Sequence, residues 1–364
     1  MALENQTGSS DDYRVRTYEP GDRDGILSLL ETEWGYRPSV DWFDWKYVDD
    51  PYLSHVPITL AERDGEIVAI QGYVPCRVRR GKRVVSALKP VDAVVHPDHR
   101  RKGLYSRITE RGIRHYTDRE SAFFFNFPNA ASLGAQQKLG WSEVTVVPMY
   151  YRLQRPSELL PTGQAAAPAG RVADSIARTG LGLWEQIAAT SAGYDVERYA
   201  SPPGNALESI YESDVPRTFH VHREAQYYRW VLDAPSAGHT VYVANRDGRP
   251  VAALVTRSNG DGDVMVFDAV PLGANHDAFA DLLAAVIADN EGASTLSVTD
   301  QTLSSTLLSR FGFVSYETPI LSRLCTPTHM AIRPLWSEEG TGPFSRRELA
   351  DAENWSLSFL EVKD

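Results

Sequence analysis

The chain has 364 residues and a formal net charge of −11, with 42% hydrophobic and 23% charged residues. This length exceeds what one hydrophobic core usually serves, so two domains are expected. The acidic charge disfavours nucleic acid as the main partner, because affinity for the phosphate backbone needs a basic surface. No apolar run approaches the roughly 20 residues that span a bilayer. Residues 1–12 are too polar for a signal peptide, so we expect a disordered N-terminus, a cytoplasmic protein and no membrane partner.

The cysteines indicate neither a disulfide framework nor a metal site. Cys76 and Cys325 lie far apart in the sequence, in no spacing typical of metal binding or redox chemistry. We therefore expect two thiols without a disulfide, and no bound metal.

The first 53 residues predict a strand and then a helix. The stretch "DYRVRTYEP", residues 12–20, alternates in the manner of a strand. An apolar stripe at helical spacing follows and ends before Gly35. The stripe consists of Ile26, Leu27, Leu29 and Leu30. The next stretch, residues 41–53, is rich in aromatic side chains and is expected to be irregular.

Two hairpins and an α/β pattern complete the first half. The hairpin turns are expected at Asp64-Gly65 and around Gly81. An apolar strand then ends at Pro97, and helix, strand and helix patterns continue to Gly140, which suits a left-handed helix cap. One or two strands finish by residue 153, giving an α/β order.

The second half repeats the first after residues 154–180, whose proline, alanine and glycine content is typical of a linker. In the same order, "YYRWVLDAP" matches "FDWKYVDDP", "HTVYVANRDGRPVAALVTR" matches "PITLAERDGEIVAIQGYVP", "VFDAV" matches "PVDAV", and "LLSRFGFVSYETPILSRL" matches "AQQKLGWSEVTVVPMYYRL". We infer a tandem duplication, with domains at 13–153 and 181–330. A tail follows at 331–364. It contains a helix capping box, "SRRE", at residues 345–348, and its final residues are expected to pack as a strand.

The stretch "HPDHRRKGLYSRI", residues 96–108, places three cations between a strand and a helix. The first turn of a helix has backbone N–H groups without partners, and a phosphate fits there. Gly103 would let the backbone approach such an anion without a Cβ in the way. The cluster alone also fits a solvated basic turn. However, the matching stretch of the second half, "VPLGANHDAFADLL", has lost the arginines, which favours a function over a structural need.

These motifs carry a family resemblance. "VVHPDHRRKGLYSRI" resembles motif A of the GCN5-related N-acetyltransferase (GNAT) superfamily, and "NFPNAASLGAQQKLGW" resembles that superfamily's next helix. The resemblance covers residues 13–153, and the second half resembles only the fold. It implies an α/β protein of two tandem GNAT-like domains, each a mixed, centrally splayed β-sheet flanked by helices, with a degenerate second domain.

The resemblance also implies a site for acetyl-CoA, used as the acyl donor. A splayed strand would bind the pantetheine arm through Ala93, Val94 and Val95. The basic loop would bind the pyrophosphate and consists of Arg100, Arg101, Lys102, Gly103, Leu104 and Tyr105. The next helix would flank the arm with Asn129 and Ser132. Two residues depart from the family pattern. Tyr105 stands where glycine or alanine is usual, and Gln136 stands where many members have a tyrosine acid.

Acyl transfer to an amine needs a group that removes a proton from the nitrogen. Asp92 is our candidate for this base, or for a substrate anchor, and backbone donors of the splayed strand would hold the oxyanion. The alternative is a structural carboxylate, which the matching Asp268 favours. His96 and His99 titrate in a useful range, but both also fit a loop surface.

We therefore expect an acyl-CoA-dependent N-acetyltransferase (EC 2.3.1) that acylates a small-molecule or peptide amine in a ternary complex. Neither cysteine lies near the motif, which disfavours a covalent acyl-enzyme. One alternative is a non-catalytic acyl-CoA-binding or regulatory protein, which Gln136 favours. Another is a tRNA-dependent aminoacyl transferase of tandem GNAT fold, which the acidic charge disfavours. A homodimer is left open.

Overall fold

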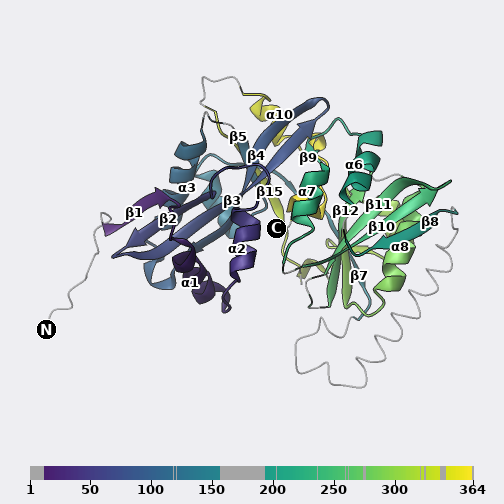
Figure 1. Cartoon of the computed structure of the whole chain (residues 1–364), viewed down its shortest axis with the longest axis horizontal. Coiled ribbons are helices and arrows are strands. Elements are labelled where there is room, and N and C mark those ends of the chain that lie inside the picture. Colours follow the sequence, from purple (N-terminus) through teal and green to yellow (C-terminus); the bar gives the residue numbers. More distant parts are fainter. Residues whose placement is uncertain are drawn as a thin grey trace, which may run out of the picture. The chain divides into compact units, whose positions relative to one another are not determined.

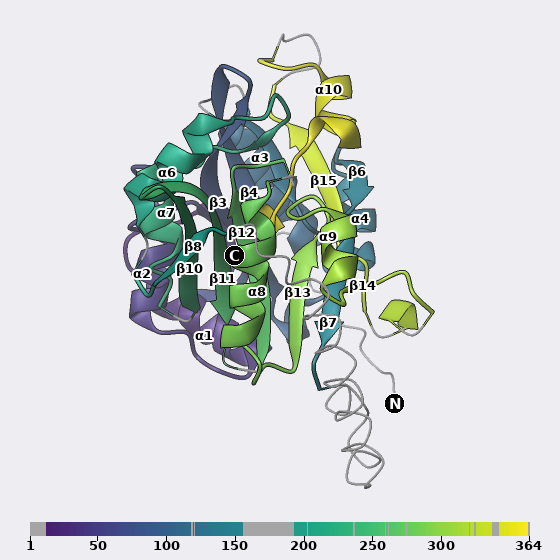
Figure 2. The ribbon, with the colours of Figure 1, turned by 90° about the vertical axis from the view of Figure 1, so that its right-hand side faces the viewer.

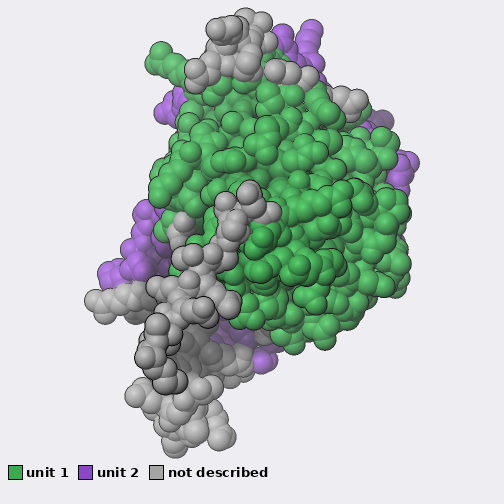
Figure 3. Space-filling view, turned by 90° about the vertical axis from the view of Figure 1, so that its left-hand side faces the viewer, with its two compact units in different colours: residues 1–77, 85–144, 330–350 green, residues 78–84, 145–329, 351–364 purple. Residues whose placement is uncertain are grey.

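The computed structural model describes residues 12–155 except 118 and 120, and residues 193–362 except 202, 236, 259, 261, 274–275, 320, 324 and 337–341. The expected disordered N-terminus and the linker at 154–180 lie almost wholly outside the described residues. The chain divides into two compact units (Figure 3). Unit 1 comprises 1–77, 85–144 and 330–350, and unit 2 comprises 78–84, 145–329 and 351–364. None of the helices that the structure describes is long and apolar enough to cross a membrane.

The first sheet has eight strands, most of which lie in unit 1 (Figure 1). Their order is β1-β2-β3-β4-β5-β15-β6, and β9 pairs with the end of β3 that belongs to unit 2. The bounds are β1 (Arg14–Thr17), β2 (Ile58–Arg63), β3 (Glu66–Arg80), β4 (Arg83–Val95), β5 (Ser121–Asn126), β6 (Ser142–Val146), β9 (His220–Val221) and β15 (His329–Pro334).

The second sheet has seven strands, in the order β14-β7-β13-β12-β11-β10-β8. The bounds are β7 (Met149–Leu153), β8 (Asp195–Tyr199), β10 (Gly238–Arg246), β11 (Arg249–Ser258), β12 (Asp263–Val270), β13 (Thr295–Thr299) and β14 (Val314–Ser315).

Both sheets are splayed at their centre. The parallel pairing of β4 with β5 runs only from Ser86–Ser121 to Leu88–Phe124. In the second sheet, the parallel pairing of β12 with β13 covers Asp263 to Met265 only. In the described part of the chain, the later residues of β4 and β12 have no strand partner on that side. The expected fold, two mixed and centrally splayed sheets flanked by helices, is therefore confirmed.

The corresponding hairpin turns of the two sheets have the same backbone conformation. Asp64 and Gly65 connect β2 to β3 with φ of 53° and 84°, and Asp247 and Gly248 connect β10 to β11 with φ of 53° and 71°. Two successive left-handed residues give the turn that fits the twist of a hairpin, and Asp-Gly is the sequence that adopts it most readily. Both halves thus use the same local solution at the same place.

Each sheet contains strands from both halves of the sequence, since β9 and β15 lie in the first sheet and β7 lies in the second. β7 lies in the second sheet between β14 and β13, although residue 149 belongs to the first repeat. β15 lies in the first sheet between β5 and β6, although it is more than 180 residues further along the chain. Figure 2 shows β15 beside β6. The packed units therefore do not coincide with the sequence ranges 13–153 and 181–330, which stay a prediction about the ancestral repeats.

The helices of unit 1 follow the sequence pattern except at one place. α1 (Arg23–Trp34) buries the four residues of the expected stripe and ends at Gly35, whose φ is 74°. The stretch expected to be irregular instead contains α2 (Val40–Tyr47), because the Ser39 side chain caps it by accepting a hydrogen bond from the Trp42 amide at 3.1 Å. After β4 come a 3₁₀ turn, η2 (Pro97–His99), and α3 (Leu104–Tyr116), and after β5 comes α4 (Ala130–Gln137).

Unit 2 and the tail contain the helices that follow in the sequence. These are α6 (Gly204–Ser213), α7 (Ala225–Val231), α8 (Ala278–Asp289), α9 (Ser305–Arg310), η4 (Leu321–Arg323), α10 (Arg346–Ala350), η5 (Ala352–Asn354) and α11 (Phe359–Val362). The capping box is confirmed, since the Ser345 and Glu348 side chains each accept the other's amide. The expected terminal strand is wrong. The Glu361 carboxylate accepts the Ser358 amide at 2.7 Å, which closes a helical turn instead.

Candidate active site

The basic loop lies between the splayed end of β4 and the start of α3. Arg101 has φ of 61° and Gly103 has φ of 72°, so the backbone is left-handed twice just before the helix begins. No side chain caps the N-terminus of α3. Its first-turn amides are therefore available to a ligand at the end of the helix that carries partial positive charge.

Tyr13 organises the charges of this loop, and sequence reasoning missed it. Its buried hydroxyl accepts from Lys102 Nζ at 3.2 Å and lies 2.9 Å from His99 Nδ1. The guanidinium groups of Arg63 and Arg107 lie over its ring, at 5.5 and 5.9 Å from the centroid. Burial, followed by the charges of Lys102 and other neighbours, lowers the pKa of His99. The loop therefore has a positive field, as an anion site requires.

The two arginines of the loop differ in their contacts. Arg100 pairs with Glu33 of α1, and its Nε donates to the Val95 carbonyl at 3.2 Å. Arg101 is exposed. Arg101 is thus the more available charge for an incoming anion, while Arg100 also ties the loop to α1 and to the end of β4.

The residues expected to bind a cofactor arm lie around the splay, but several could do so only through their backbone. Ala93 is exposed, Val94 is buried and Val95 is half-buried. Leu104 is buried in the core with Ile108, so only its amide could face a ligand. Asn129 caps α4 by accepting the Ser132 amide at 2.9 Å, which fixes the start of that helix beside the splay.

Two side chains at the splay have a buried carbonyl oxygen without a partner in the described part of the chain. They are Asn126 Oδ1, at the last residue of β5, and Gln136 Oε1, near the end of α4. Phe124 packs in the core beneath α3 and α4 with Tyr116 and Leu133. Asn126, two residues further along the same strand, shares that face. Buried polar atoms are nearly always hydrogen-bonded in folded proteins, so each of these oxygens requires a donor, which water or a ligand can supply.

Asp92 lies where β4 leaves β5, and its backbone is left-handed, with φ of 48°. Lys46 Nζ lies 2.8 Å from its Oδ2, and the Tyr47 hydroxyl donates to the same oxygen. Both partners come from the end of α2, and a Cβ at position 72 would overlap the Tyr47 ring, so Gly72 makes room for it. Within the described residues, no hydrogen bond or ion pair engages Asp92 Oδ1, and 13% of the side chain is exposed.

The matching aspartate of unit 2 has no such open oxygen. Asp268 is 1% exposed, and Arg223 donates to both of its oxygens, at 2.8 Å to Oδ1 and 3.0 Å to Oδ2. Tyr228 also donates to Oδ2 at 2.7 Å. Asp268 is therefore a structural carboxylate. Asp92 is held through one oxygen in a similar way but presents the other, as a base or substrate anchor would.

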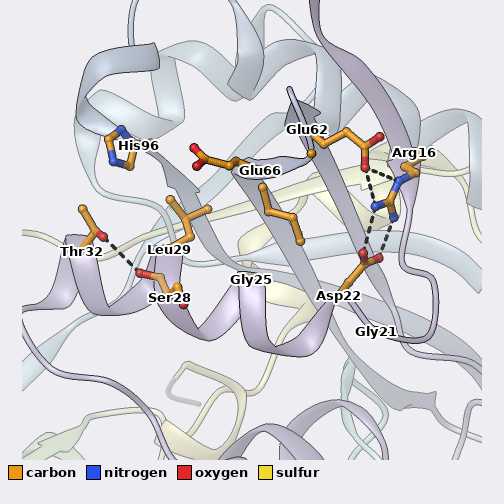
Figure 4. A pocket seen from close by; sticks show the side chains of 12 residues that line it. Arg16, Gly21, Asp22, Gly25, Ser28, Leu29, Thr32, Glu62, Glu66 and His96 are labelled. Carbon is orange, nitrogen blue, oxygen red and sulfur yellow. Dashed lines mark hydrogen bonds and ion pairs between the residues drawn. The ribbon is translucent and has the colours of Figure 1, made fainter.

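Cavities of unit 1 lie away from the start of α3. One of about 500 Å³ lies between α1 and the β2–β3 hairpin (Figure 4). In it, the Arg16 guanidinium points between two carboxylates, bonding Asp22 at 2.6 Å and Glu62 at 2.5 Å. Two others, of about 510 and 470 Å³, share His55, His115, Tyr116 and Arg119. In the described part of the chain, no group of three or more His, Cys, Asp or Glu residues could hold a metal ion.

A mixed sheet that splays between two parallel strands, with a basic glycine loop opening a helix at the splay, is the arrangement expected of a GNAT-type domain. Residues 14–144 match the family model described as an acetyltransferase (GNAT) domain. A comparison with curated proteins found no match.

Several solved structures share the fold. A GCN5-related N-acetyltransferase from Anabaena variabilis aligns with a TM-score of 0.61 at 8% identity, over 89% of this chain and 73% of that one. A probable N-acyltransferase from Enterococcus faecalis aligns with a TM-score of 0.61 at 10% identity, over 89% and 73%. Eis1 from Mycobacterium abscessus aligns with a TM-score of 0.55 at 13% identity, over 89% and 74%. At these identities the likeness establishes the fold.

Proposed function

We propose that unit 1 transfers an acyl group, acetyl by family resemblance, from acyl-CoA to the amine of a small molecule or peptide. One observation carries the proposal. The pairing of β4 with β5 stops at Leu88–Phe124, and beside the resulting gap α3 begins with an uncapped, left-handed, basic loop. Acyl-CoA needs amides that bind a pyrophosphate and strand backbone that bonds a long amide-containing arm, and the start of α3 and the unpaired end of β4 would provide these groups.

The polar groups at the splay fit the coenzyme. Arg101, Gly103 and the first-turn amides of α3 would hold the pyrophosphate. The unpartnered carbonyl oxygens of Asn126 and Gln136 match the amide N–H groups of a pantetheine arm, and Ala93, Val94 and Val95 would contribute backbone groups. When bound, the coenzyme supplies an activated acyl group as a thioester.

In this proposal, Asp92 prepares the amine. Its Oδ2 is fixed by Lys46 and Tyr47, so Oδ1 has a defined position from which to anchor an ammonium group or accept a proton from the attacking nitrogen. Backbone N–H groups of β4 beyond the splay would stabilise the oxyanion. The contrast with Asp268, whose two oxygens are both engaged, supports this role for Asp92.

Unit 2 is proposed to bind no acyl-CoA. Where α3 has a basic loop, α8 has Asp277 at its N-cap and an acidic first turn. A carboxylate there would repel a pyrophosphate, so we propose one acyl-CoA site per chain, in a protein that acts in the cytoplasm.

Release of the CoA thiol tests this function. The protein is incubated with acetyl-CoA and a panel of amines that covers aliphatic amines, amino sugars and lysine peptides, and released thiol is measured against reactions without amine. Amine-dependent thiol release with a matching acetylated product would support transferase activity. Tight binding of acetyl-CoA without turnover on any amine would favour the non-catalytic binding protein, and absence of binding would overturn both.

A further inference from the structure

The C-terminal segment, residues 355–362, lies where the second sheet opens. The parallel pairing of β12 with β13 stops at Met265–Ser297, and beyond it the two strands separate. Every residue of the segment except Ser356 is buried within unit 2. Its last part, α11, packs against β12. The segment therefore lies beside the strand that has lost its partner.

One side of the segment is bound to the end of β13. The Leu357 carbonyl accepts hydrogen bonds from the Thr299 hydroxyl at 3.2 Å and the Thr302 hydroxyl at 3.4 Å. The Leu357 amide donates to Gln301 Oε1 at 2.9 Å. Thr299 is the last residue of β13. Both backbone groups of Leu357 are thus held by this strand end and the turn that follows it.

The other side of the segment is bound to β12 through Arg223. The Arg223 guanidinium donates to Asp268 of β12 at 2.8 Å. It also donates to Ser358 Oγ at 3.1 Å and pairs with Glu361 Oε1 at 3.0 Å. Glu361 Oε1 accepts the Val221 amide at 3.0 Å as well. Arg223 and Glu361 are completely buried, and a buried charge is stable only when it is paired and hydrogen-bonded, so these contacts fix the segment in one position.

The two splays also differ in their chemistry. Counted from the parallel strand pairs, Asn126 of β5 corresponds to Val298 of β13. The sequence match between the two halves likewise pairs Gln136 with Leu308. Asn126 and Gln136 each have a buried oxygen without a partner in the described part of the chain, whereas Val298 and Leu308 lie in the core of unit 2. Unit 2 therefore lacks the polar atoms proposed for the coenzyme arm, and its apolar gap suits the apolar side chains of the segment.

We propose that the splay of unit 2 is a peptide-binding site whose ligand is the C-terminal segment, held in the place that unit 1 offers to acyl-CoA. The comparison with the coenzyme rests on the proposed function, whereas the peptide site itself does not. The site recognises the backbone of Leu357, the Ser358 hydroxyl and the Glu361 carboxylate. A coenzyme is thus excluded from unit 2 by occupation as well as by the charge of Asp277.

Cleavage of the full chain tests this site. A protease recognition sequence is inserted between Ala350 and the exposed Asp351, so that cleavage separates the segment from the rest of the chain. The released peptide, residues 351–364, should stay bound during gel filtration, and a fluorescently labelled synthetic copy should replace it at one per chain. A labelled peptide with Glu361→Gln should bind at least about tenfold more weakly, because Arg223 loses a buried partner. Glu353→Gln makes the same chemical change at an exposed position and should leave the affinity unchanged.

Three results would overturn the peptide site. The first is release of the peptide from a folded, cleaved chain with no rebinding of the labelled copy. The second is equal affinity of the wild-type and Glu361→Gln peptides. If cleavage unfolds the chain, hydrogen exchange in the uncut protein decides. Glu361→Gln should then speed exchange of the amides of residues 266–270 in β12 relative to Glu353→Gln, and equal rates are the third contrary result.

Acetyl-CoA distinguishes this inference from the proposed function. It should bind the cleaved chain at one site and should not displace the labelled peptide. Displacement of the peptide by acetyl-CoA would show that the splay of unit 2 accepts the coenzyme, which contradicts the inference. Absence of acetyl-CoA binding with intact peptide exchange would instead overturn the proposed function and support the peptide site alone.

Discussion

Lys46 Nζ lies 2.8 Å from Asp92 Oδ2, and both side chains are largely buried, at 5% and 13% exposure. The lysine comes from α2 and the aspartate from the splayed end of β4, so this ion pair fixes α2 to the point where the sheet opens. The Tyr47 hydroxyl reinforces the pair from the same helix. The contact orients one carboxylate oxygen, as the base or substrate anchor proposed for Asp92 requires.

Replacing the two matching aspartates should therefore have different effects. Asp92→Asn should reduce turnover by about a hundredfold or more, because it removes a positioned base. Asp268→Asn should lower the free energy of unfolding by about 3 kcal/mol, because it breaks a buried ion pair with Arg223, while the rate per folded molecule is kept. Steady-state kinetics and denaturant unfolding of both variants measure this. Stability loss with full activity in both would make Asp92 purely structural.

The charges of the basic loop should matter for binding and little for folding. Arg100→Glu with Arg101→Glu should weaken acetyl-CoA affinity at least about a hundredfold, since two charge-assisted hydrogen bonds are lost and the new carboxylates repel the pyrophosphate. The Arg100–Glu33 pair is partly exposed, so its loss should cost no more than about 1 kcal/mol. Calorimetry and thermal melts check both points. Asp277→Arg, in unit 2, is the control and should leave the affinity for acetyl-CoA unchanged. If the double variant binds acetyl-CoA with wild-type affinity, the basic loop is only a solvated turn.

Sequence patterns predicted most local elements because short-range chemistry determines them. The Asp-Gly turns, the α1 stripe before Gly35 and the Ser345–Glu348 box each depend on residues close in sequence. α2 was missed because its main signal is a single capping serine, Ser39, among aromatic residues. The exchange of β7 and β15 could not be predicted, because either strand satisfies the same apolar pattern in either sheet and only tertiary pairing decides between them.

The strand exchange makes a specific prediction about truncation. A fragment of residues 12–155 should fail to unfold cooperatively, because its sheet lacks β15, the strand between β5 and β6. Unpaired strand edges would also favour aggregation. Circular dichroism and analytical ultracentrifugation of this fragment, alone and fused through a flexible linker to residues 325–350, measure the effect. A monomeric, cooperatively folded 12–155 fragment would contradict the pairing described here.

Unit 2 should lose stability in mild acid through His220. Its Nε2 lies 2.8 Å from the Tyr211 hydroxyl and its Nδ1 lies 2.8 Å from the Thr218 carbonyl, so the neutral ring is fully bonded. Burial, followed by the charge of Arg223, lowers its pKa from 6.5 to about 3. At pH values between about 3 and 6.5, His220 is protonated in the unfolded chain and neutral in the folded chain. Stability should thus fall as pH drops below 6.5, by up to about 1.4 kcal/mol per pH unit.

Urea unfolding between neutral and acidic pH, for wild type and His220→Gln, tests this dependence. The variant should be less stable at neutral pH but should show a shallower decline in acid. His96→Gln, at a partly exposed loop histidine, serves as the control and should retain the wild-type slope. If the stability of His220→Gln falls with decreasing pH as steeply as that of wild type, a group other than His220 causes the acid sensitivity.

The candidate site was predictable to the extent that it is made of backbone and local sequence. The loop from Arg100 to Tyr105 follows from its glycine and its charges. The partners that give these residues their roles were not predictable, because they approach through tertiary contacts. Tyr13 reaches Lys102 from β1's start, and Lys46 reaches Asp92 from α2. No spacing along the sequence signals either contact.

Titration calorimetry with acetyl-CoA tests the central claim most directly. The account predicts a single binding event with one site per chain, because unit 1 retains the basic loop at α3 and unit 2 has Asp277 in the corresponding place. The heat of that event should disappear in the Arg100→Glu, Arg101→Glu variant and persist in Asp277→Arg. Two equivalent sites per chain, or no binding by the wild-type protein, would contradict it.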